Sequence, residues 1–126
     1  MPTLAQVHAW LAVGAAIAAV LATLAGAAMG AGLAGGRRWL VLADRLILAL
    51  LVLVAVALAL GPVLVLGRGA GPSDPLHLVY AGVALLAMPV LRLEAMRRQS
   101  ARVGWWGCAG GLVTLGALLR LWATGG

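Results

Sequence analysis

The sequence has few charged side chains, and none of its cations is a lysine. Nine arginines stand against three acidic residues, so charged residues make up 10% of the 126 positions and the net charge is +6. A soluble domain carries about a quarter charged residues, whereas apolar residues here make up 64% and the mean hydropathy is +1.11. This composition excludes an ordinary soluble domain and predicts an integral membrane protein.

Cysteine is almost absent as well. Cys108 is the only cysteine, which excludes an internal disulfide and a cluster of thiolate metal ligands. Glycine and alanine surround it, so we interpret Cys108 as a small packing residue in a helix interface, with a reactive thiol as the alternative.

An excess of arginine in a soluble chain would suggest a nucleic-acid partner. Here the arginines crowd into short connectors between apolar runs, as expected when positive charge orients a protein in a membrane. We therefore predict the lipid bilayer as a partner and expect no nucleic acid.

Four apolar runs are long enough to cross a hydrocarbon core, which needs about 20 residues. We predict an all-α, four-transmembrane-helix bundle that forms one domain over residues 1–126, with spans at 4–29, 39–66, 75–91 and 103–122. A signal peptide is the alternative for the first run. That run lacks a basic region before it and exceeds the usual apolar length of about 7–15 residues, so we favour a retained helix.

Local signals mark where the helices begin and end. Thr3 and Gln6 have the spacing of a capping box, which predicts a helix from Leu4. Asp74 and Pro75 are residue types typical of an N-cap and a first helical position. A proline inside the second run, at position 62, predicts a kink or an end there.

The arginines also predict the orientation of the bundle. Under the positive-inside rule, the connectors that hold most of them lie in the cytoplasm of a bacterial plasma (inner) membrane, and both termini lie in the periplasm or outside. Arg68 and Arg120 fall on the opposite side. The arginines assigned to the cytoplasmic side are Arg37, Arg38, Arg45, Arg92, Arg97, Arg98 and Arg102.

Small residues recur at helical spacing in two of the spans. Lipid chains are as apolar as leucine, so membrane helices associate through close backbone approach at small residues. We expect these residues to form a packing interface inside the bundle, with docking of other membrane subunits or self-association as the alternative. They are Gly14, Ala18, Ala22, Gly26 and Gly30 in the first span and Gly104, Gly107 and Gly111 in the fourth.

Two histidines lie near helix starts on the side of the termini. His8 and His77 are predicted within about 3 Å of the same depth. The positive end of a helix dipole disfavours the imidazolium, and neutral imidazole is the form that ligates a metal. The pair is the minimum for a b-type haem with two histidine ligands, whose propionate Arg120 could bind. Interfacial hydrogen bonding is the alternative for each histidine.

The run from Leu60-Gly61 to Gly67, followed by Leu76-His77-Leu78-Val79-Tyr80-Ala81, resembles one half of the haem A synthase family. The resemblance implies a four-helix bundle with a haem-ligating histidine near the outer end of two helices. In that family the first histidine lies in a Glu-x-x-His-Arg motif, whereas the matching stretch here reads Ala5-Gln6-Val7-His8-Ala9. Because the glutamate and the arginine are missing, the resemblance leaves the synthase activity unsupported and keeps haem binding open. The Asp-Pro-Leu-His-x-x-Tyr stretch is similar to small four-helix bacterial membrane proteins, which implies no function.

The acidic residues Asp44, Asp74 and Glu94 all fall near the ends of predicted spans. We interpret Asp44 as an interfacial side chain, with a polar network inside the bundle as the alternative, and Glu94 as an ion-pair partner of Arg98. Catalysis by a carboxylate base is disfavoured, and so is transport, because no charge lies near the middle of a span.

We therefore predict a small accessory subunit of a larger membrane complex, respiratory or otherwise electron-transferring, and no catalytic residue. A b-type haem protein is the first alternative, and a small transporter or quinone-site protein is the second.

Overall fold

The computed structural model describes residues 1–33, 35–68, 75–97 and 103–124, and that part of the chain is helical apart from short connections. The helices are α1 (Leu4–Gly30), α2 (Arg37–Arg68), α3 (Leu76–Arg97) and α4 (Val103–Thr124). All four are long and apolar enough to cross a membrane. The predicted all-helical architecture with four candidate transmembrane helices is confirmed.

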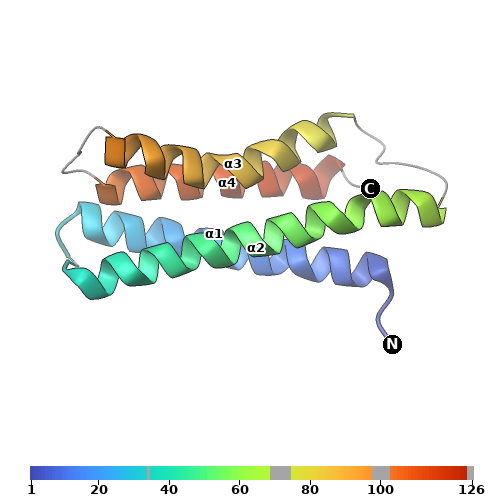
Figure 1. Cartoon of the computed structure of the whole chain (residues 1–126), viewed down its shortest axis with the longest axis horizontal. Helices are drawn as coiled ribbons and strands as arrows, with labels where there is room; N and C mark the ends of the chain where they lie inside the picture. The colour runs from blue at the N-terminus through green and yellow to red at the C-terminus, as the bar shows by residue number, and fades with distance from the viewer. Residues whose placement is uncertain (34, 69–74, 98–102, 125–126) are drawn as a thin grey trace.

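The helices form an up-and-down bundle (Figure 1). α1 packs against α2 and α4, α4 also packs against α3, and α2 and α3 share a smaller contact. α1 begins and α4 ends at the same end of the bundle, which we call the terminal end (Figure 1). We call the opposite end the arginine end, because Arg37, Arg38, Arg92 and Arg97 lie there.

The start of α1 is fixed by its own side chains. The Gln6 backbone N–H donates to Thr3 Oγ1 at 3.2 Å, and the Thr3 backbone N–H donates to Gln6 Oε1 at 2.8 Å. This reciprocal pair satisfies two backbone donors that the first helical turn would otherwise leave open. The predicted capping box and the helix start at Leu4 are both confirmed.

The other helix limits follow the sequence signals only in part. Gly32 and Gly36 have φ angles of 75° and 88°, a backbone conformation that favours glycine, and the chain reverses between α1 and α2 there. α2 continues through Pro62. The proline removes one backbone hydrogen bond from the helix without ending it. α3 starts at Leu76, and the predicted N-cap Asp74 lies outside the described residues.

Small side chains dominate the core. Ala15, Ala19 and Ala22 of α1 are 1%, 0% and 5% exposed. The largest fully buried side chains are Leu50, Met88 and Thr114. Thr114 satisfies its hydroxyl within α4, because Oγ1 donates to the Gly110 carbonyl at 2.8 Å. The narrow core brings the helices close together, and many larger apolar side chains face outward.

Candidate functional site

His8 lies on the core-facing side of α1. It is seven residues before Ala15, which is 1% exposed, and residues seven apart lie on nearly the same face of a helix. Its Nδ1 is buried and makes no hydrogen bond to any other atom of the protein. A buried polar atom without a partner costs about 1–3 kcal/mol, so this nitrogen is the clearest sign of a ligand-binding role in the described chain.

His77 occupies the matching position on α3. It is half-buried and lies seven residues before Ala84, which is 2% exposed. The capping box of α1 and the start of α3 at Leu76 therefore place His8 in the second turn of α1 and His77 in the first turn of α3, on the core-facing sides of their helices.

Contacts along the bundle compare the depths of the two histidines. Gly14 of α1 lies beside Leu53 of α2, and His8 is six residues nearer the terminal end than Gly14. Arg92 of α3 bonds Asp44 of α2, and His77 is fifteen residues nearer that end than Arg92. Counting six residues along α2 from Leu53, or fifteen from Asp44, leads to Ala59 in both cases. When the count is made instead through the contacts that α1 and α3 each make with α4, the depths of the two histidines differ by about 7 Å, because the helices tilt against one another. Both therefore lie at the terminal end, within about 7 Å of the same depth.

Arg120 and Tyr80 form a second polar contact at the terminal end. Arg120 Nε donates to Tyr80 Oη at 3.4 Å, and the guanidinium carbon lies 5.4 Å from the centre of the tyrosine ring. The pair joins α4 to α3 beside the turn that carries His77. Arg120 was predicted to bind a haem propionate. In the structure Arg120 contacts Tyr80 on the exposed surface of the bundle.

Two imidazoles at one end of a bundle limit the chemistry that is possible there. Among the described residues there is no group of three or more histidine, cysteine or acidic side chains that could hold a metal ion. A structural zinc ion needs four protein ligands, whereas haem iron needs only one or two because the porphyrin supplies the rest. The two histidines therefore fit the axial positions of a haem better than a bare metal ion.

The small residues of α1 and α4 meet at the arginine half of the bundle. A Cβ atom added to Gly26 would lie 2.5 Å from the Cys108 nitrogen and 2.7 Å from the Gly104 oxygen. One added to Gly30 would lie 2.6 Å from the Trp105 ring. Thr23 packs against Gly111 in the same interface, and a Cβ added to Gly107 would lie 3.9 Å from the Gly26 Cα. Only glycine permits backbones to approach this closely.

The small residues that recur from Gly14 to Gly30, which we call the α1 stripe, do not all face the same neighbouring helix. A step of four residues turns the helix by about 400°, so a stripe of this spacing rotates about 40° per step. Gly14 consequently faces α2, where an added Cβ would lie 3.5 Å from Leu53, while Gly26 faces α4. Ala18 and Ala22 between them are 7% and 5% exposed.

An ion pair that the sequence analysis missed joins α2 to α3. Arg92 Nη2 donates to Asp44 Oδ1 at 2.7 Å, and the two side chains are 21% and 58% exposed. It links the two neighbouring helices that contact each other least. Glu94 pairs with Arg97 at 3.2 Å, and its predicted partner Arg98 lies outside the described residues. The sequence did carry a signal for the Asp44–Arg92 pair. Asp44 lies near the start of one helix and Arg92 near the end of the next, so the two residues have the same depth when the helices are antiparallel.

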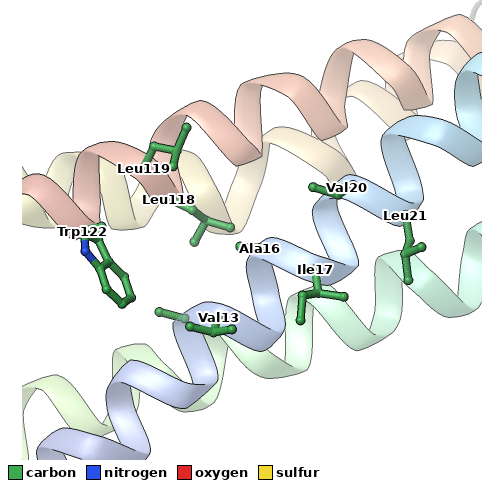
Figure 2. A pocket seen from close by; sticks show the side chains of 9 residues that line it. Val13, Ala16, Ile17, Val20, Leu21, Leu118, Leu119 and Trp122 are labelled. Carbon is green, nitrogen blue, oxygen red and sulfur yellow. The ribbon is translucent and has the colours of Figure 1, made fainter.

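Two apolar grooves flank the outward face of α1. The first, about 330 Å³, lies between α1 and α4 and is lined by Val13, Ala16, Ile17, Leu118 and Trp122 among others. Figure 2 shows Leu118 and Trp122 pointing from α4 toward α1. The second, about 360 Å³, lies between α1 and α2 near the arginine end. Neither groove is lined by a histidine.

No protein-family model, curated protein or solved structure matches the chain. The resemblance to haem A synthase therefore stays a prediction.

Proposed function

We propose that the chain is an integral membrane protein that crosses the bilayer four times, with its arginine end in the cytoplasm and both termini outside. The support is the distribution of charge between the two ends. Arg37, Arg38 and Arg45 start α2, and Arg92 and Arg97 end α3 at the same end of the bundle. The positive-inside rule assigns that end to the cytoplasm.

Within that membrane the chain works as a small accessory subunit of a larger complex, respiratory or otherwise electron-transferring. The observation that carries this proposal is the exposure of α2. Only 11% of the most apolar window of α2 is buried, against 17% for α3, 28% for α4 and 33% for α1. Val52 and Val56 are 52% and 44% exposed in the middle of the helix. α2 therefore offers a partner a long apolar face that the bundle itself does not use, whereas the glycines of α1 and α4 already contact one another.

A photoreactive amino acid at Val52 tests this proposal. We expect irradiation of intact membranes to give one discrete cross-linked product at Val52. The partner in that product should also co-purify with the chain without cross-linking, in a complex that contains an electron-carrying subunit. Leu86 of α3, which is 56% exposed, is the matched control and should yield mainly lipid adducts. A chain that migrates alone on native gels and labels only lipid at both positions would contradict an accessory role.

Haem binding is the second candidate function, and the buried Nδ1 of His8 without a hydrogen-bond partner favours it. His8 and His77 would hold the iron from α1 and α3, which lie diagonally across the bundle. On the core side of α2 near their depth, Gly61 has no atom within 4 Å of an added Cβ. A bound haem supplies one-electron transfer, which agrees with an electron-transferring complex.

The visible spectrum of the purified chain tests haem binding. We expect sharp b-type bands in the reduced-minus-oxidised spectrum, lost in His8→Ala and in His77→Ala, because each variant removes one axial ligand. Leu78→Ala is the control, since it changes a side chain next to His77 that is 70% exposed, and it should keep the bands. A folded protein, expressed with ample haem, that shows no bands would rule this function out.

A further inference from the structure

An apolar groove of about 360 Å³ lies between α1 and α2. Its lining runs from Leu21 to Ala28 on α1 and from Trp39 to Leu46 on α2. Each stretch covers seven residue steps, or about 10 Å of helix. An open groove of this length, lined by apolar side chains alone, suits part of an acyl chain.

Positive charge flanks this groove at the arginine end. Arg38 precedes Leu42 by four residues and Arg45 follows it by three, so both lie within about 60° of Leu42 around the helix, at one edge of the groove. Both are exposed, and within the described chain neither pairs with a carboxylate. The nearby Asp44 bonds Arg92 toward α3. Trp39 lines the same end of the groove, where an interfacial aromatic is expected.

We propose that this groove binds one anionic phospholipid. Its acyl chain lies between α1 and α2, and its phosphate is bound by Arg38 together with Arg45. The inference rests on the proposed crossing of the bilayer and not on the proposed partner complex. The α1–α4 groove provides the contrast: it is similarly apolar and similar in volume, but Arg120 on α4 is engaged with Tyr80 of α3.

Native mass spectrometry of the purified chain tests the proposal, with phosphatidylglycerol and phosphatidylcholine of identical acyl chains as probes. We expect the first phosphatidylglycerol to bind about tenfold more tightly than the first phosphatidylcholine. Arg38→Gln should lower the phosphatidylglycerol affinity about fivefold and leave phosphatidylcholine unchanged, because a basic residue at an anionic surface contributes about 1 kcal/mol. Ala28→Leu should weaken both lipids, because it fills the groove.

Two matched variants control for charge and volume. Arg37→Gln removes the same charge five residues before Leu42, on the other side of α2, and Ala16→Leu fills the α1–α4 groove. Neither should change the first phosphatidylglycerol affinity. Equal binding of both lipids, or an equal loss in Arg37→Gln and Arg38→Gln, overturns the proposal. Displacement by millimolar inorganic phosphate also overturns it, since that indicates a simple anion site. Failure of the Val52 cross-linking experiment to capture a protein partner would not change these lipid results. If instead the proposed crossing of the bilayer is wrong, the chain should retain neither lipid.

Discussion

Gly26→Ala is expected to destabilise the bundle by about 3 kcal/mol, although the same exchange usually stabilises a helix. The added Cβ would lie 2.5 Å from the Cys108 nitrogen, 2.7 Å from the Gly104 oxygen and 2.9 Å from the Gly107 carbonyl carbon. All three are backbone atoms, so no side chain can rotate away and the two helices must separate. Overpacking of this kind costs about 1–3 kcal/mol and occasionally more.

Gly116→Ala in α4 is the matched control. No atom lies within 4 Å of a Cβ added there, so only the conformational term remains, and alanine is favoured over glycine in a helix by about 0.5–1 kcal/mol. The two variants should therefore shift stability in opposite directions. Reversible unfolding in mixed micelles with increasing dodecyl sulfate measures both. Equal shifts would mean that α1 and α4 are not in backbone contact at Gly26.

Leu50→Ala is expected to destabilise the bundle by about 1–3 kcal/mol. Leu50 is 1% exposed and belongs to the core cluster that includes Ala15 and Met88. In a soluble protein the exchange costs about 2–5 kcal/mol, as a transfer term plus a cavity term. In a bilayer the transfer term nearly vanishes, because lipid chains are as apolar as leucine, and the lost packing contacts remain.

Leu48→Ala separates these two contributions. Leu48 is 61% exposed and two residues away on the same helix, so its truncation leaves a space that lipid fills. We expect a change below about 0.5 kcal/mol in bilayers or micelles. The same unfolding assay measures the pair. A loss at Leu48 as large as that at Leu50 would contradict the proposed exposure of α2 to lipid or partner.

Features that depend on near neighbours in sequence could be predicted before the fold was known. Four apolar runs predicted four helices, because their length and composition need no information about distant residues. Thr3 and Gln6 predicted the start of α1, because a capping box closes within a single turn. The placement of His8 and His77 near helix starts followed in the same way.

Features that depend on how the helices face one another were decided only by the tertiary structure. The stripe from Gly14 to Gly30 was visible as a pattern, but its rotation around α1 divides it between α2 and α4. The Asp44–Arg92 ion pair joins residues 48 positions apart, and the groove between α1 and α2 needs two helices at a defined separation.

The sequence by itself thus determined the all-helical class, the number of helices in the described chain and most of their starts. The tertiary structure decided which small residues touch, which charges pair and where the outward grooves lie. The physical reason is that local hydrogen bonding and hydrophobic length are written in consecutive residues. Close packing depends instead on the rotation, tilt and depth of each helix relative to its neighbours, which no single run of sequence encodes.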